Sequence, residues 1–463
     1  MLQHPFISCL ALISIPLVIV TIDKFNAHEL KKIFNLGKEM RSIRRNKPKL
    51  PTPIKKENNG TLIGYNGKRE IIVPDTCKHV FIAGTTGSGK TVTLSNFIQR
   101  ATEQNFPTMI IDGKGDIGEG SLLDITTRFC NKYQRKLYII NLSDPQHSDQ
   151  YNPFQNSSPT TAKDMLVNLT EWSEEHYKSN TERFLQRLVV LMDEAGIDLS
   201  FKTILKYLNT DGFDFLSASL LKSETITKQD HMFNLEISKA CGKIAEQASA
   251  RFSTIAESEI GSILSENGID IYTALQEKAV ILFILNPLIY PEISPLMGKL
   301  ILTDARKAVS KLFNSNQTRV FFVCDEISNY ACPALLDLVN KSRSAGITNI
   351  LATQSLSDMD NAVNEYFKEQ IIENCNNYIV MRQNSSVNAE HWASILGTRA
   401  TLEVTYQLEQ QTGTTAQTGL GSAKRVREFL YHPDDIKSLS TGKAFYLSRD
   451  QNFHCKLNVN KPF

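Results

Sequence analysis

One stretch of the chain has the residue types and the spacing needed to hold phosphate groups. It reads GTTGSGKT, follows the apolar run HVFIA and precedes VTLSNFIQRA, in which apolar residues recur at helical spacing. In this G-x-x-x-x-G-K-[S/T] pattern, glycines let backbone N–H groups surround phosphate oxygens, and the helix adds the positive end of its dipole. A chance match in a glycine-rich turn is the alternative, against which the order of strand, motif and helix argues. We predict that nucleotide is bound by Gly84, Thr85, Thr86, Gly87, Ser88, Gly89, Lys90 and Thr91.

A second apolar run, VFFVCDE, ends in two acids, Asp325 and Glu326. A carboxylate at the end of a buried strand can hold Mg²⁺, and a glutamate one residue later can polarise the attacking water. Two surface acids capping a strand are the alternative, which the phosphate motif disfavours. We therefore predict ATP and Mg²⁺ as cofactors, with Thr91 and Asp325 on the metal and Lys90 on the β- and γ-phosphates. The chain lacks a guanine-binding N-K-x-D motif, which favours an ATPase over a GTPase.

Two further residues have spacing that suits a nucleotide site. Gln354 ends the apolar run NILAT and can sense the γ-phosphate or position water; a plain polar loop residue is the alternative. Arg343 lies between the acidic strand and the Gln354 strand, and it can reach the γ-phosphate of a neighbouring subunit as an arginine finger. From spacing alone, a solvated arginine at a helix end is an equally good interpretation of Arg343.

A second glycine pattern, Gly113-Lys-Gly115-Asp-Ile-Gly118, follows the apolar run TMIID. It formally matches a dinucleotide-binding motif, but the position about 20 residues on, where an acid is needed, falls in the run LYIIN. We interpret it instead as a turn at a strand end beside the phosphate motif. Asp112, Lys114 and Asp116 are then expected to face the same site.

The elements that position these residues are predicted from short apolar runs that lack alternation. These runs are typical of strands covered on both faces and predict a parallel α/β sheet; they lie at 79–83, 108–112, 137–141, 279–285, 320–325, 349–353 and 377–381. Between residues 141 and 279 the pattern turns helical, which favours an inserted all-α domain of about a hundred residues. The low-complexity segment Glu409–Gly421 is expected to be a mobile loop.

The amino terminus predicts a membrane anchor. Residues 1–22 carry no Lys, Arg, Asp or Glu, and Pro5–Ile22 is long enough to cross a bilayer as a tilted helix. A cleaved signal peptide and a buried apolar helix are the alternatives, but no positive segment precedes the run. Eleven Lys and Arg follow it within residues 24–56, and by the positive-inside rule they place the bulk of the chain in the cytoplasm. We expect a single-pass protein of the bacterial inner membrane.

Charge and cysteine content narrow the classes of function. The chain of 463 residues has a net charge of +2, yet residues 24–56 carry +9 and the chain beyond them −6. A protein that is basic throughout is therefore excluded, and any DNA contact must use a few local basic groups; the candidates are Lys239, Lys243, Arg251, Lys424, Arg425 and Arg427. The eight cysteines are far apart and show no zinc-ligand spacing.

In their order, these motifs resemble those of the type IV secretion coupling proteins, the TraG/TraD family of conjugation ATPases, which belong with the FtsK/HerA-type ring motors. The resemblance rests on GTTGSGKT, DGKGD, YNPF at 151–154, the block at 323–355 and REFLYHPDDIKSLSTGKAFYL at 427–447. It implies a RecA-like sheet, a homo-hexamer, and a helical domain that receives a relaxase–DNA complex. It also implies that Arg343 is a finger in trans and Gln354 a sensor.

The resulting prediction is a P-loop ATPase with five segments: an anchor at 1–23, a basic segment and linker at 24–60, a nucleotide-binding domain split between 61–155 and 277–463, and an all-α domain at 156–276. It would couple single-stranded DNA with its relaxase, other relaxosome proteins or a protein substrate to components of a type IV channel. The alternatives are a DNA translocase outside secretion and a substrate receptor in which ATP acts only as a switch.

Overall fold

The computed structural model describes residues 59–463 except 77, 170–171, 173, 314–318, 360–362, 365 and 412–413. The predicted anchor and most of the basic segment lie outside the described residues. Within the described part, no helix combines the length and apolar character needed to span a bilayer. The described chain forms two compact units, one of residues 59–392 and 433–463 and the other of residues 393–432.

The first unit is built on an eleven-stranded sheet, in the order β2-β1-β13-β12-β9-β3-β8-β7-β4-β6-β5. Seven neighbouring strands are parallel. They are β9 (Asn377–Val380), β3 (Val80–Ala83), β8 (Ile347–Thr353), β7 (Val320–Asp325), β4 (Thr108–Asp112), β6 (Val280–Ile284) and β5 (Leu137–Asn141). These seven are the strands that the apolar runs predict, with ends that differ by up to two residues.

The prediction of a purely parallel sheet is wrong at one edge. Four antiparallel strands continue the sheet beyond β9: β12 (Lys443–Ser448), β13 (Phe453–Val459), β1 (Gly60–Asn66) and β2 (Arg69–Pro74). In β1, β2 and β13, buried residues alternate with more exposed ones, because these strands are covered on only one face. Their runs therefore include polar residues and do not stand out as continuous apolar segments.

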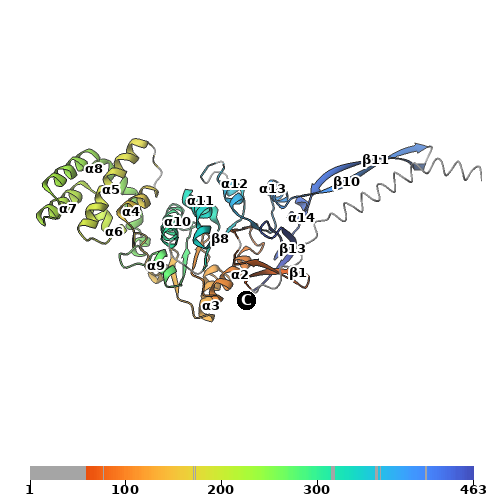
Figure 1. Cartoon of the computed structure of the whole chain (residues 1–463), viewed down its shortest axis with the longest axis horizontal. Helices are drawn as coiled ribbons and strands as arrows, with labels where there is room; N and C mark the ends of the chain where they lie inside the picture. The colour runs from red at the N-terminus through yellow and green to blue at the C-terminus, as the bar shows by residue number, and fades with distance from the viewer. Residues whose placement is uncertain are drawn as a thin grey trace, which may run out of the picture. The chain divides into compact units, whose positions relative to one another are not determined.

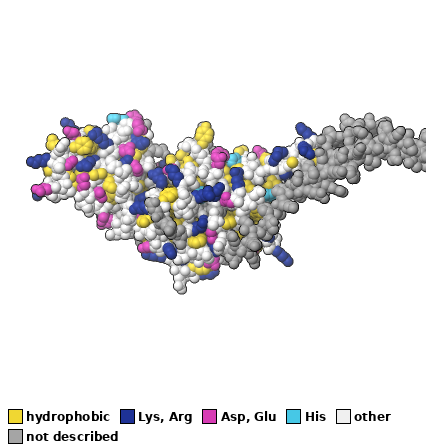
Figure 2. All heavy atoms as spheres, viewed as in Figure 1, with side chains coloured by type: hydrophobic (Ala, Val, Ile, Leu, Met, Phe, Trp, Pro, Cys, Tyr) yellow, Lys and Arg dark blue, Asp and Glu magenta, His cyan; other side chains and the backbone are white. Residues whose placement is uncertain are grey.

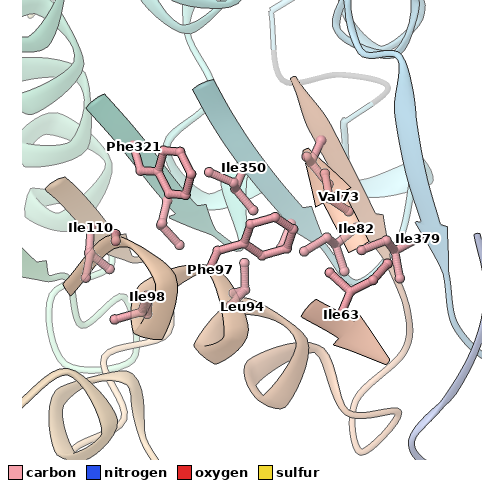
Figure 3. Close-up of a cluster of buried hydrophobic side chains, with 14 of the residues drawn as sticks. Ile63, Val73, Ile82, Leu94, Phe97, Ile98, Ile110, Phe321, Ile350 and Ile379 are labelled. Atoms are coloured by element: carbon pink, nitrogen blue, oxygen red, sulfur yellow. The ribbon is translucent and has the colours of Figure 1, made fainter. Parts of the chain in front are cut away.

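Helix α2 (Lys90–Glu103) supplies much of the core on one face of the sheet. Leu94, Phe97 and Ile98 of this helix are buried and belong to the same hydrophobic cluster as Ile82 and Ile350 of the strands (Figure 3). Each fully buried side chain of this size contributes about 1.5–3 kcal/mol to stability. This packing holds α2 against the sheet, and Lys90 and Thr91 are the first two residues of the helix.

The other helices outside the segment 156–276 lie between strands in the sequence. They are α3 (Leu122–Lys132), α10 (Ile293–Leu312), α11 (Pro333–Lys341), α12 (Phe367–Asn374), α13 (Ser386–Leu396) and α14 (Pro433–Lys437). Ser121 caps α3 by accepting a hydrogen bond from Asp124 N, and Pro333 opens α11 at a position that needs no N–H donor. Local sequence thus marks where α3 and α11 begin.

The segment 156–276 is helical, and its described residues contain no strand. Its helices are α4 (Pro159–Val167), α5 (Glu175–Glu194), α6 (Phe201–Tyr207), α7 (Thr210–Lys222), α8 (Lys228–Ala256) and α9 (Ile271–Gln276) (Figure 1). Helix α5 packs against α8, and the Phe184 and Phe213 rings of α5 and α7 lie 4.6 Å apart. Five of these helices begin at a polar residue whose side chain accepts a cap hydrogen bond. These residues are Ser158, Ser200, Asn209, Thr227 and Asp270.

The segment Glu409–Gly421 was predicted to be a mobile loop, and that prediction is wrong. The second unit contains a two-stranded hairpin of β10 (Thr398–Gln411) and β11 (Thr414–Phe429), in which Gln411 pairs with Thr414. β-Branched threonine favours extended backbone, and cross-strand hydrogen bonds supply the pairing. Low complexity conceals this structure because it leaves no apolar alternation to detect.

Basic and acidic side chains are interspersed on the face of the molecule that Figure 2 shows, with scattered hydrophobic side chains between them. The basic residues that the sequence suggested for DNA contact divide between two elements. Lys239, Lys243 and Arg251 are exposed on α8, and Lys424, Arg425 and Arg427 are exposed on β11. Surface exposure leaves each of them accessible to a polyanion and equally compatible with an ordinary solvated charge.

Candidate nucleotide-binding site

The predicted phosphate loop connects β3 to α2 at the carboxyl end of the parallel strands. Its start is tied to both neighbouring strands, because Gly84 N donates to Thr353 O (3.3 Å) and Thr85 N donates to Arg382 O (3.0 Å). Gly87 and Gly89 have φ angles of 72° and 110°, in the left-handed region that favours glycine. The glycines of the motif therefore allow the turn that the sequence pattern predicts.

Lys90 is buried at the base of this loop. Its Nζ atom donates to Gly84 O at 2.6 Å and lies 3.9 Å from Glu326 Oε2. Burial lowers the pKa of Lys90 to about 8, because the charged form loses its hydration. A phosphate oxygen at this position would restore a strong partner for the ammonium group.

Glu326 directly follows β7 and has a backbone conformation that is uncommon for its type, with φ 48° and ψ 56°. Its Oε1 atom accepts hydrogen bonds from Gln354 N (3.0 Å), Ser328 Oγ (3.2 Å) and Thr353 Oγ1 (3.3 Å). Its buried Oε2 atom has no hydrogen-bond partner within the described part of the chain. One carboxylate oxygen is thus firmly held, and the other is left for a ligand or water.

Asp325 ends β7 and pairs in register with Asp112, which ends β4. Asp325 Oδ2 forms an ion pair with Lys114 Nζ at 3.1 Å. Burial and the nearby Asp325 carboxylate raise the pKa of Asp112 to about 7. Asp112 Oδ1 also accepts hydrogen bonds from Lys114 N (2.9 Å) and Gly115 N (3.2 Å), so it shapes the turn that carries Lys114.

A cavity of about 240 Å³ lies next to Thr91 and Asp325. Its wall also includes residues 118–122 and the three polar residues of the second glycine pattern, which are Asp112, Lys114 and Asp116. The structure thus brings these three residues to the phosphate loop, as the sequence predicts.

The donor chemistry of the cavity fits Mg²⁺. The Thr91 hydroxyl and the Asp325 carboxylate are hard oxygen donors, and Mg²⁺ commonly takes one or two such protein ligands, with phosphate and water for the rest. Across the described residues, no group of three His, Cys, Asp or Glu side chains is arranged to hold a metal ion. A pair of protein oxygen donors, Thr91 and Asp325, suits a metal that arrives with a nucleotide.

Gln354 joins the site and Arg343 does not. Gln354 Oε1 accepts a hydrogen bond from Thr86 Oγ1 at 2.7 Å, which links the tip of β8 to the phosphate loop. Arg343 is exposed in the turn η4 (Ser342–Ala345), before β8 begins. The seven residues of β8 span about 20 Å. Arg343 therefore lies at the amino ends of the parallel strands, whereas the phosphate loop of its own chain lies at their carboxyl ends.

The structure adds contacts that sequence reasoning did not predict. Thr441 Oγ1 donates to Gly87 O and Gly442 N donates to Ser88 O, both at 2.9 Å, so the turn before β12 supports the phosphate loop. Arg382, which follows β9, accepts the hydrogen bond from Thr85 N through its carbonyl group. The segment STGKAFYL belongs to the block 427–447 that carries the family resemblance, but no local pattern links it to the phosphate loop.

Comparison with known protein families identifies the family of this chain. Residues 71–460 match the model of the type IV secretion-system coupling protein DNA-binding domain. The chain belongs to the type IV secretion-system coupling proteins. The resemblance seen in its motifs is thereby confirmed. A Mycoplasma pneumoniae (strain ATCC 29342 / M129 / Subtype 1) protein described as uncharacterized is 30% identical to this coupling protein over 101 residues, which are 22% of this chain and 67% of that protein.

Solved structures show the same fold. The unbound bacterial conjugative coupling protein TrwBdeltaN70 has a TM-score of 0.64 at 16% identity, over 89% of this chain and 90% of that one. TrwB in complex with ADP and Mg²⁺ gives 0.62 at 16% identity, over 88% and 94%. VirB4 of Thermoanaerobacter pseudethanolicus gives 0.54 at 12% identity, over 87% and 97%. This coupling protein therefore has the α/β fold of TrwB.

Proposed function

We propose that this coupling protein is a membrane-anchored ATPase. It would bring a relaxase–DNA complex or a protein substrate to a type IV secretion channel and drive or license transfer by ATP hydrolysis. The observation that carries the proposal is the convergence of Lys90, Glu326 and Asp325 beside the phosphate loop. Family membership and the nucleotide complexes of TrwB support it.

Each residue has a role that its position suits. Lys90 would neutralise the terminal phosphates, while Thr91 and Asp325 would hold Mg²⁺, which supplies electrophilic charge at those phosphates when bound. Glu326 would accept a proton from the attacking water through Oε2, because its other oxygen is already held by three donors. Gln354, bonded to Thr86, would report the state of the loop to β8.

The ATPase proposal is tested with the full chain in detergent and two variants. We expect Lys90→Ala to lose nucleotide binding, whereas Glu326→Gln should bind ATP with hydrolysis slowed about 10²–10⁴-fold. Single-stranded DNA should raise the rate of the wild type. The motor proposal fails if DNA changes neither the rate nor the oligomeric state and Lys90→Ala still supports export. DNA stimulation without any effect on export would instead favour a translocase outside secretion.

Arg343 would act in a neighbouring subunit of a homo-hexamer, since it is exposed and lies far from its own phosphate loop. Mixing two inactive variants tests this arrangement. Arg343→Ala keeps an intact phosphate loop, and Lys90→Ala keeps an intact finger, so mixed rings should regain part of the ATPase activity that neither variant shows alone. A mixture that stays inactive, although the two variants co-assemble, would contradict a finger in trans.

A further inference from the structure

We propose that Lys114 is a second cation of the nucleotide site, which holds Asp325 before Mg²⁺ binds and moves to the terminal phosphates when Mg²⁺ takes Asp325. The inference rests on the proposed ATP site and adds to it a residue that would exchange partners during each cycle. It assigns Lys114 a direct contact with substrate.

The first support is the position of the Lys114 ammonium group on a predicted metal ligand. Lys114 Nζ lies 3.1 Å from Asp325 Oδ2, and the Asp325 side chain is only 2% exposed. The other oxygen, Oδ1, accepts the hydrogen bond from Glu326 N at 3.0 Å. Both carboxylate oxygens of Asp325 are therefore engaged. Mg²⁺ and an ammonium group repel each other at such short range, so metal binding must displace Lys114.

The second support is that hydrogen bonds hold the backbone of Lys114, while Asp325 holds its flexible side chain by the terminal ammonium group. Lys114 N donates to Asp112 Oδ1, and the preceding Gly113 N donates to Asp325 O at 3.2 Å. The side chain, by contrast, is 24% exposed and has four rotatable methylenes between the backbone and the charge. The residue can thus swing its ammonium group without moving the turn that carries it.

The third support is the destination. Lys114 and Thr91 line the same cavity of about 240 Å³, which lies beside the phosphate loop. Lys90 and Lys114 both lie beside the acids at the end of β7, with Lys90 Nζ 3.9 Å from Glu326 Oε2 and Lys114 Nζ 3.1 Å from Asp325 Oδ2. Two cations therefore lie beside two adjacent carboxylates. A triphosphate brings the negative charge that both can share.

A static ion pair between the ends of β4 and β7 is the competing explanation, and Mg²⁺ dependence distinguishes the two. The experiment measures binding of a fluorescent ADP analogue and a fluorescent non-hydrolysable ATP analogue to the full chain as Mg²⁺ is titrated. The variants are Lys114→Met and Lys114→Gln, so that a folding defect in one does not decide the result. Lys222→Met, on the exposed surface of α7, is the matched control.

If Lys114 exchanges partners, its removal should lower the Mg²⁺ concentration needed for half-maximal ADP binding. It should also weaken binding of the Mg²⁺-loaded ATP analogue and slow hydrolysis about tenfold or more. An unchanged or higher Mg²⁺ requirement would overturn the inference, because Lys114 would then not compete with the metal. A lower requirement with unchanged affinity for the ATP analogue would overturn the transfer to the phosphates. If the wild type binds but does not hydrolyse ATP, the proposed function fails, while the Mg²⁺ result still tests Lys114.

Discussion

Glu326 shows how single residues prepare this site. A left-handed backbone costs a residue with a Cβ atom about 1–2 kcal/mol, and here it lets the carboxylate turn back toward β8. Three donors then hold Oε1, and Oε2 stays within 3.9 Å of Lys90. The uncommon backbone conformation of Glu326 thus points its carboxylate toward β8, where ordinary strand geometry would not place it.

His79, directly before β3, is a buried residue whose titration affects the stability of the core. Its Nε2 atom donates to Val339 O at 2.8 Å, and its Nδ1 atom accepts from Asn349 N at 3.1 Å. The ring is therefore held in its neutral form, and burial lowers the pKa of His79 from 6.5 to about 4. The unfolded chain binds a proton at a higher pH than the native chain does.

This difference predicts a pH dependence of stability. The contribution of His79 should be complete above pH 6.5 and be lost as the pH falls toward 4, at a total cost of about 3 kcal/mol. Urea unfolding across this window measures it, and His79→Gln should show a correspondingly smaller loss. An identical pH dependence in wild type and His79→Gln would show that His79 does not titrate as proposed.

At the level of elements, the order of strands builds the site from distant segments. β3, β8, β7 and β4 are neighbours in the sheet, so their carboxyl ends bring the phosphate loop, Gln354, Asp325 and Asp112 to one edge. The turn after β4 must pass close to the end of β6, because a Cβ atom on Gly115 would lie 2.0 Å from Leu285 O. The packing of neighbouring strands therefore requires glycine at this position.

Two glycines of this turn form a matched pair for a test. Gly115 and Gly120 both have φ of 76°, but a Cβ atom on Gly120 would meet nothing within 4 Å. We expect Gly120→Ala to cost about 1–2 kcal/mol of unfolding free energy, from backbone strain alone. Gly115→Ala should cost about 1–3 kcal/mol more, because the backbone must also shift. Urea unfolding measures both, and equal losses would refute the close approach to Leu285.

At the scale of the whole molecule, the chain contacts α10 both where it enters the helical segment 156–276 and where it leaves it. Tyr151 N donates to Ile263 O (2.8 Å), which ties the segment that enters the helical region to the segment that leaves it. Lys307 of α10 then donates to Pro153 O at 2.8 Å and pairs with Asp304 at 2.9 Å and Asp270 at 3.1 Å. A buried cluster of charges thus fastens both ends of the helical segment to the sheet unit.

Removing the cation from this cluster should loosen the fold. Lys307→Met leaves the buried carboxyl groups of Asp270 and Asp304 without their partner, and we expect a loss of about 3–5 kcal/mol. Tyr151→Phe, which removes one hydrogen bond of 2.8 Å to Asp304, should cost only about 1 kcal/mol. Thermal or urea unfolding compares the two. A Lys307→Met variant as stable as Tyr151→Phe would rule out the cluster as an anchor.

Much of this site was predictable because its residues form recognisable patterns within short stretches of sequence. The phosphate loop, the two acids at the end of the β7 run and the glutamine after β8 each come with an apolar run, and the carboxyl ends of neighbouring parallel strands lie side by side. The predicted strands were found for the same reason. The antiparallel edge and the β10–β11 hairpin were missed, since strands exposed on one face and threonine-rich strands leave no continuous apolar run.

Local pattern therefore determined the family of this protein, its phosphate loop and its acidic strand end. Tertiary structure alone decided that Lys114 forms an ion pair with Asp325 and that Thr441 donates a hydrogen bond to the phosphate loop. It also decided that Arg343 lies away from the nucleotide site of its own chain. These contacts join residues that are hundreds of positions apart or lie at opposite ends of one strand. Such contacts depend on strand order and side-chain packing, which no short stretch of sequence encodes.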